Sequence, residues 1–248
     1  MDRIERTIHY CWFGGGEHPA LVRSCIESWR THLNDYRIVC WNEERFDTSS
    51  HPFVRQAYAA GKWAFVADYV RFYALYQHGG IYLDTDVMVW KSFDRFLSHR
   101  AFSGLEFHPE MFFESVKRGS VAGLGILSAV VGAEKGHPWI HRLLSQYDGR
   151  QFNDDPRSCE RLIVSGLMAH ISACEFGFEY VPLYQVLRTD VHLYPPDVFC
   201  SKPSTDNPLL CASHHCLSSW REPEAPGPLL SRVARRIRPR WNPRRSPS

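Results

Sequence analysis

The sequence predicts an α/β fold, a single Rossmann-like domain in which helices flank a mixed central sheet. Strand-like and helix-like patterns alternate over residues 7–83, and a glycine-rich turn follows the first of these strands. A chain of 248 residues with 44% hydrophobic content can bury one substantial core. No linker interrupts residues 1–220, so we expect one domain over 1–225 and a basic, flexible tail over 226–248.

The first half of the chain alternates strands and helices. Residues 7–13 are apolar and aromatic enough for a buried strand, and Pro19 opens an amphipathic helix that runs to about residue 32. Residues 36–41 predict a second strand and 52–60 a second helix. In such α/β sheets, ligands bind outside the carboxyl ends of the strands.

Residues 64–89 organise the rest of the chain. Apolar residues recur three and four apart over 65–76 and predict a helix, on which Asp68 and Arg71 share a different face. Gly79 and Gly80 supply the left-handed backbone that ends the helix. Residues 81–83 are short and apolar, which indicates a core strand.

The second half is predicted with less regular patterns. We expect an edge strand at 87–89, a helical turn at 93–97 and a strand at 101–107. Residues 123–136 mix small and apolar residues and are expected to form a loop and a helix. Amphipathic helices are predicted at 138–147 and 160–171, and short strands between 178 and 199. Glu106 is a candidate substrate contact, with an exposed loop glutamate as the alternative.

Asp84 and Asp86 follow the core strand directly, and strand alternation would point both carboxylates to one side with Thr85 turned away. Two such carboxylates repel each other unless a cation lies between them. Mg²⁺ or Mn²⁺ suits this position, because both ions keep open positions for phosphate oxygens. The alternative is a pair of solvated loop acids.

Composition constrains the partners and the compartment. The net charge is only +2, but Arg232–Arg245 holds seven arginines and no acid. This tail is either solvated or attracted to anionic lipid, and nucleic acid is not an expected partner. No run of about 20 apolar residues and no signal-peptide core are present, so we expect a cytoplasmic protein that is either free or peripheral on the inner face of the membrane.

The eight cysteines are expected to be reduced thiols in that compartment. Cys200, Cys211 and Cys216, with His214 and His215 nearby, leave a structural zinc site as a minor alternative. Their spacing contains no CxxC pair, which is the usual signature of such a site.

The run ADYVRFYALYQHGGIYLDTD at 67–86 resembles the SDYxRxxxLYxxGGIYLDxD signature of glycosyltransferase family 32, with Ala67 where the family usually has serine. IHYCWFGGG at 8–16 is similar to the family's first strand and nucleotide loop, and SHHCLSSW at 213–220 to its closing HHxxxSW element. The resemblance implies a GT-A-type fold and metal-dependent transfer of a sugar, with retention of anomeric configuration. The donor would be a nucleoside diphosphate sugar and the acceptor a hydroxyl of a saccharide or glycolipid, in bacterial surface polysaccharide or glycolipid synthesis.

The resemblance also implies roles near the metal. Asp84, Asp86 and His215 would hold the ion, with the alternative that the histidines are a surface pair. Arg71, kept extended by Asp68, would place a cation near the leaving group, or else form a buried structural ion pair. Asp84, Asp86 and Arg71 are therefore the predicted catalytic residues.

The remaining expected substrate contacts come from four other segments. Trp12 would stack on the nucleotide base unless it is only a core residue, and Gly14 would let the backbone approach the nucleotide. Asn42 would reach the nucleoside unless it only forms a turn. Tyr82, Ser219 and Trp220 complete the set, the last two as hydrogen-bond donors to the diphosphate. A nucleotide-sugar hydrolase and a noncatalytic nucleotide-sugar-binding subunit are the rival functions.

Overall fold

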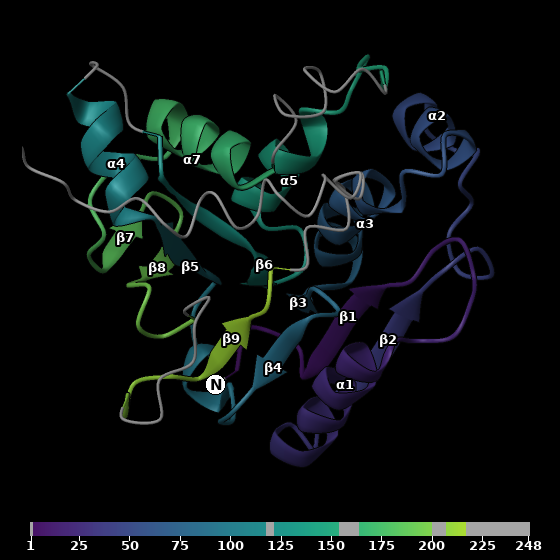
Figure 1. The fold of residues 1–248 in the computed structure, drawn as a ribbon, viewed down its shortest axis with the longest axis horizontal. Helices are drawn as coiled ribbons and strands as arrows, with labels where there is room; N and C mark the ends of the chain where they lie inside the picture. The colour runs from purple at the N-terminus through teal and green to yellow at the C-terminus, as the bar shows by residue number, and fades with distance from the viewer. Residues whose placement is uncertain (1, 118–121, 154–163, 200–206, 217–248) are drawn as a thin grey trace, which may run out of the picture. The chain divides into compact units, whose positions relative to one another are not determined.

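The protein is described by a computed structural model over residues 2–117, 122–153, 164–199 and 207–216 (Figure 1). Seven strands form a mixed sheet in the order β2-β1-β3-β6-β5-β8-β7, and a second sheet pairs β4 with β9. The predicted α/β architecture, a mixed central sheet flanked by helices, is confirmed. The strands are β1 (Thr7–Cys11), β2 (Arg37–Trp41), β3 (Gly80–Leu83), β4 (Val87–Val89), β5 (Ala101–Phe107), β6 (Leu124–Ala133), β7 (Gln185–Leu187), β8 (Val191–Tyr194) and β9 (Ala212–His214).

Six α-helices lie in the described part of the chain. They are α1 (Ala20–His32), α2 (Pro52–Ala59), α3 (Trp63–His78), α4 (Pro109–Val116), α5 (Pro138–Ser145) and α7 (Val164–Glu175), and Asp94–Phe96 adds one 3₁₀ turn. Proline opens α2, α4 and α5, where its fixed φ suits the first helical turn. None of the helices in the described segments is long and apolar enough to cross a membrane.

The parallel half of the sheet follows the prediction closely. β1 pairs in parallel with β2 on one side and with β3 on the other, and α1 and α3 make the connections. Gly79 and Gly80 end α3 with φ angles of +68° and +100°, as the pattern predicted. The helix is one turn longer than predicted from its apolar spacing, because Trp63 and His78 extend it at both ends.

The prediction of a loop and helix over residues 123–136 is wrong. This segment contains β6, a ten-residue strand with every residue buried, and β6 lies antiparallel between β3 and β5. A strand buried on both faces shows no polar alternation, so its small and apolar residues gave no period-two signal. At Gly132 an added Cβ would lie 2.1 Å from the Phe102 ring, so this glycine is required by packing.

The helices α3 and α7 cover one face of the large sheet, and the small sheet with α1 covers the other (Figure 1). α3 packs on β1 and β3, and α7 packs on β6, while α1 packs on β4 of the small sheet (Figure 1). Trp29 of α1 is fully buried and its indole N–H donates to the carbonyl oxygen of Val87 at 2.7 Å. The hydrophobic core on this side joins α1, β4 and the large sheet.

Candidate active site

The two aspartates of the DxD motif follow β3, as predicted, but they lie in a tight turn that leads into β4 and do not continue the strand alternation. The Val87 N–H donates to the Asp84 carbonyl oxygen at 3.0 Å, which closes the turn. The Asp84 N–H donates to Ala129 of β6 at 2.9 Å, and the carbonyl of Asp86 accepts from the His215 N–H at 3.0 Å. The turn is therefore fixed by the large sheet at one end and by β9 at the other.

Both aspartate side chains converge on one histidine. The Nε2 atom of His214 lies 3.1 Å from Oδ1 of Asp86 and 4.0 Å from Oδ2 of Asp84. One ligand atom from each of the three residues lies within 4.8 Å of the others. We call Asp84, Asp86 and His214 the DxD–His group.

The histidine in this group is His214, whereas the sequence favoured His215. β9 pairs antiparallel with β4 so that His214 lies opposite Val87, next to the DxD turn. The side chain of His215 is exposed, and only its backbone N–H reaches Asp86. Adjacent residues on a strand point to opposite faces, so only one of the two histidines can face the aspartates.

The electrostatics of His214 follow from its two acidic neighbours. Burial alone would lower the pKa of His214, but hydrogen bonds to Asp86 and Cys216 and the charges of both aspartates raise it to about 11. Without a cation, the imidazole is therefore protonated at neutral pH and offsets the carboxylate charges. A metal ion would replace that proton, because imidazole binds metals in its neutral form.

Arg71 is held on the α3 side of the site, and its side chain is only 3% exposed. Its Nη2 atom lies 2.9 Å from Asp68 and 3.1 Å from Asp84, and Nη1 donates to the Ser128 carbonyl at 2.7 Å. The guanidinium carbon lies 4.6 Å from the centre of the Tyr82 ring. Arg71 thus joins the two partly buried acids in one ion-pair network and orients Asp84.

Asp68 and Arg71 influence each other strongly. Burial raises the pKa of Asp68 to about 7, although the positive charge of Arg71 opposes the change. Burial alone would lower the pKa of Arg71, but the charges of Asp84, Tyr82 and Asp68 raise it. The arginine therefore stays charged, and it compensates the carboxylates of Asp68 and Asp84.

The glycine-rich turn after β1 is organised by protein contacts. Gly14 has a φ of +83°, and an added Cβ would lie 2.4 Å from the Trp63 ring. Its N–H donates to the Glu43 carboxylate at 2.7 Å. Trp12 is half-buried, and its indole N–H donates to the Gly16 carbonyl at 3.1 Å. These contacts fix the turn, and the nucleotide roles of Trp12 and Gly14 stay predictions.

Of the remaining predicted contacts, the structure describes Asn42 but not Ser219 or Trp220. The Asn42 carbonyl accepts from the N–H groups of Arg45 and Phe46, so this residue forms a turn, and its predicted contact with a nucleoside stays untested. Ser219 and Trp220 lie outside the described residues, as does the predicted domain border at residue 225. Within the described part of the chain, the DxD–His group is the one cluster with metal-ligand geometry, and no cysteine-based zinc site is found there.

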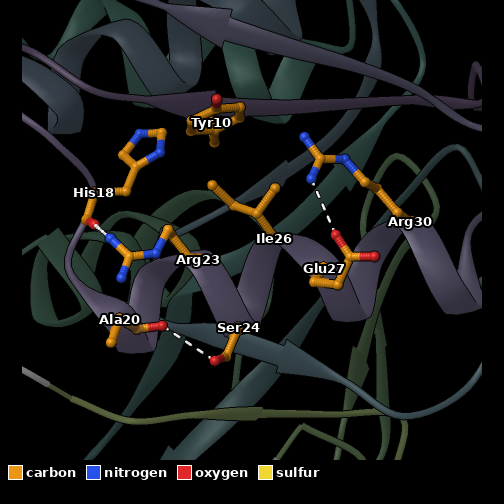
Figure 2. Close-up of a pocket in the computed structure, with 8 residues that line it drawn as sticks. All are labelled: Tyr10, His18, Ala20, Arg23, Ser24, Ile26, Glu27 and Arg30. Carbon is orange, nitrogen blue, oxygen red and sulfur yellow. Dashed lines mark hydrogen bonds and ion pairs between the residues drawn. The ribbon is translucent and has the colours of Figure 1, made fainter.

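A groove of about 620 Å³ lies between α1 and the face of β1 that carries Tyr10 (Figure 2). Arg23 and Arg30 line it, but Arg23 donates to the His18 carbonyl and Arg30 pairs with Glu27 at 3.0 Å. None of the predicted site residues lines this groove. The groove and the DxD–His group therefore have no residue in common.

Comparison with known proteins bears on the same region. Residues 19–103 match the family described as "Glycosyltransferase sugar-binding region containing DXD motif". The chain is 30% identical over 158 residues to inositol phosphoceramide mannosyltransferase 3 of Schizosaccharomyces pombe. That alignment covers 60% of this chain and 39% of the relative, so the chain spans well under half the length of the curated relative it matches.

Three solved structures are similar at 14% identity. They are the PaToxG glycosyltransferase (TM-score 0.48, 70% of each chain), a glycosyltransferase involved in glycosylation of the major capsid of PBCV-1 (0.43, 85% of this chain and 93% of that one) and the galactosyltransferase LgtC with donor and acceptor sugar analogs (0.42, 85% and 87%).

The matched region contains the whole DxD turn together with Asp68 and Arg71. The sequence similarity to a mannosyltransferase extends over more than half of this chain. Residues 19–103 are therefore similar to the sugar-binding region of glycosyltransferases that contain a DxD motif, and the chain is similar over 158 residues to a mannosyltransferase.

Proposed function

We propose that the protein is a glycosyltransferase that moves a sugar from a nucleoside diphosphate sugar to an acceptor hydroxyl, with Mn²⁺ or Mg²⁺ at the DxD–His group. One observation carries this proposal. The two aspartates of the family's DxD motif converge with His214, from a segment far along the chain, so that their ligand atoms lie within 4.8 Å of one another.

The chemistry of the donor atoms fits a divalent cation. Carboxylate oxygens suit Mg²⁺ and Mn²⁺, and the imidazole nitrogen of His214 favours Mn²⁺ of the two. Three protein ligands leave coordination positions open for phosphate oxygens. When bound, the cation supplies positive charge that stabilises the leaving diphosphate.

The chain's own residues prepare this site. Arg71 holds the Asp84 carboxylate at 3.1 Å, and the His215 N–H holds the backbone of Asp86. The Nδ1 atom of His214 lies 3.4 Å from the Cys216 sulfur, which leaves Nε2 for the side of the aspartates. The predicted role of Arg71 beside the leaving group is kept as part of the proposal.

The finer parts of the proposal rest on sequence resemblance. Retention of anomeric configuration and a role in bacterial surface polysaccharide or glycolipid synthesis come from the resemblance of the 67–86 motif to family 32. The name of the mannosyltransferase relative supports a hexose as the transferred group and a glycolipid as the acceptor. Contact of the arginine-rich tail with anionic membrane is proposed on its charge alone.

The metal site can be tested by calorimetric titration of the purified protein with Mn²⁺. Replacing both Asp84 and Asp86 with alanine should abolish binding, and His214→Ala should weaken it at least tenfold, since even outer-shell partners of a metal contribute about 10–100-fold. His215→Ala is the matched control from the neighbouring position and should bind Mn²⁺ like the wild type. Equal losses in both histidine variants would contradict the assignment of His214.

The activity can be tested with the same variants and a panel of uridine and guanosine diphosphate sugars. The wild type should consume a donor in the presence of Mn²⁺, and the double aspartate variant should not. A product that carries the sugar on an acceptor supports transfer, whereas donor consumption that no acceptor accelerates would favour the hydrolase alternative. Full activity of the double aspartate variant would refute the proposal.

A further inference from the structure

Glu106 is a carboxylate near the DxD–His group that the proposed metal site does not use. The residue lies at the end of β5 and is half-buried, so the alternative of an exposed loop glutamate is wrong. Its charge interacts with those of His214 and Asp84, which places it beside the site. A half-buried acid next to another acid has an electrostatic cost, because each carboxylate charge disfavours the other.

The fold builds a specific support for this side chain. Glu106 pairs with Gly125 across the antiparallel β5–β6 ladder, so both residues face the same side of the sheet. At Gly125 an added Cβ would lie 3.4 Å from the Ser165 carbonyl oxygen, so the missing side chain lets the first turn of α7 lie close to β6. The Ser165 hydroxyl there hydrogen-bonds to the Glu106 carboxylate.

The carboxylate has capacity left after this bond. A carboxylate can accept about four hydrogen bonds, and Ser165 supplies one. Among the described residues, no lysine or arginine forms an ion pair with Glu106. The ring nitrogens of His214 are engaged by Asp86 at 3.1 Å and Cys216 at 3.4 Å, so His214 is not its hydrogen-bonded partner.

Burial raises the pKa of Glu106, against the opposing effects of His214, Ser165 and His108. A hydroxyl group from a bound molecule would offset the cost of burying the charged carboxylate, because it donates a hydrogen bond without adding charge. Sugars present several hydroxyls, and a sugar is the molecule that the proposed function brings to this place.

We propose that Glu106, supported by Ser165, is a positioning residue that accepts a hydrogen bond from a sugar hydroxyl beside the DxD–His group. The inference rests on the proposed function. The hydroxyl belongs either to the transferred sugar of the donor or to the acceptor, and kinetics distinguishes these two sources.

The test compares wild type, Glu106→Gln and Ser165→Ala, with the donor from the panel that the wild type consumes. Glu106→Gln keeps the shape but loses the charge, and should lower kcat/KM for transfer by about 10–100-fold, the range for a hydrogen bond to a charged group. Ser165→Ala should change the same kinetic parameter by a smaller factor. Glu110→Gln, at an exposed position on α4, is the matched control and should match the wild type.

A hydroxyl on the donor sugar predicts a higher KM for the donor and slower donor hydrolysis without acceptor. A hydroxyl on the acceptor predicts unchanged donor hydrolysis and a higher KM for the acceptor. Mn²⁺ titration should give the wild-type affinity in both variants, and a loss as large as in His214→Ala would overturn the positioning role in favour of a metal ligand. Wild-type kinetics in Glu106→Gln would overturn this inference alone, whereas a wild type that consumes no donor would remove the proposed function and this inference together.

Discussion

Acid should destabilise this fold through one buried histidine in β1. His9 is 2% exposed, and its Nε2 atom lies 2.9 Å from the Gly79 carbonyl oxygen. The indole N–H of Trp41 donates to Nδ1 at 3.1 Å. Because indole can only donate, Nδ1 must be unprotonated and Nε2 must carry the proton, so the folded state holds a neutral imidazole in one tautomer.

The magnitude follows from the pKa of this group. Burial lowers the pKa of His9 from 6.5 to about 4, although the Gly79 carbonyl opposes the change. The unfolded chain therefore binds the extra proton first as pH falls, and the stabilisation present above pH 6.5 is lost between about 6.5 and 4. At 1.36 kcal/mol per pKa unit, the full loss is about 3 kcal/mol, of which about 2 kcal/mol falls between pH 7.5 and 5.0.

Urea denaturation at pH 7.5 and pH 5.0, followed by tryptophan fluorescence, measures this term. His9→Gln cannot titrate, so its free energy of unfolding should change about 2 kcal/mol less between the two pH values than that of the wild type. His32→Gln removes an exposed histidine of α1 and should keep the wild-type dependence. Equal pH dependence in His9→Gln and the wild type would refute the neutral, buried state of His9.

Three further changes test the packing, the ion pairs and the tail. Gly132→Ala should lower the free energy of unfolding in urea by about 1–3 kcal/mol, because the added Cβ would overlap the Phe102 ring. Gly166→Ala is the control: an added Cβ there meets open space, and the change should be neutral or stabilising. Arg71→Met removes a buried cation from the partly buried Asp68 and Asp84 and should cost about 3–5 kcal/mol in the same measurement. Arg142→Met breaks an exposed pair with Glu175 and should cost at most about 1 kcal/mol; similar losses in the two variants would contradict the structural role of the Arg71 network. Truncation after Leu230 should reduce sedimentation with anionic vesicles, since each basic residue contributes about 1 kcal/mol, and unchanged sedimentation would exclude the tail as a lipid contact.

The sequence was sufficient where local patterns determine structure. Alternating strands and helices predicted β1, β2, α1 and α3, and the paired glycines predicted where α3 ends. It was insufficient for β6, because a strand buried on both faces has the composition of an irregular apolar segment. The helix α4 was not predicted at all, since its eight residues leave Met111, Phe113 and Val116 exposed and show no clean apolar stripe.

The candidate site likewise combines features that local sequence predicts with features that depend on distant contacts. The DxD motif and the Asp68–Arg71 pair were visible as short-range patterns, and the structure brings them together. The choice between His214 and His215 depends on the pairing of β9 with β4, and adjacent identical residues carry no information about that register. The support of Glu106 depends on a glycine in β6 and a serine in α7, two contacts that no local spacing reveals.

The three residues of the DxD–His group are attached to two different sheets, so the site depends on the contacts that hold these sheets together. Asp84 is bonded through its backbone to the large sheet, whereas His214 belongs to the small one. The small sheet is in turn fixed to α1, because Val89 donates to the Ser28 hydroxyl at 3.0 Å and Trp29 donates to Val87. The distance between the imidazole and the aspartates is therefore set by the packing of α1 on β4. Side chains that never approach a substrate thus determine whether the three ligands can share one ion.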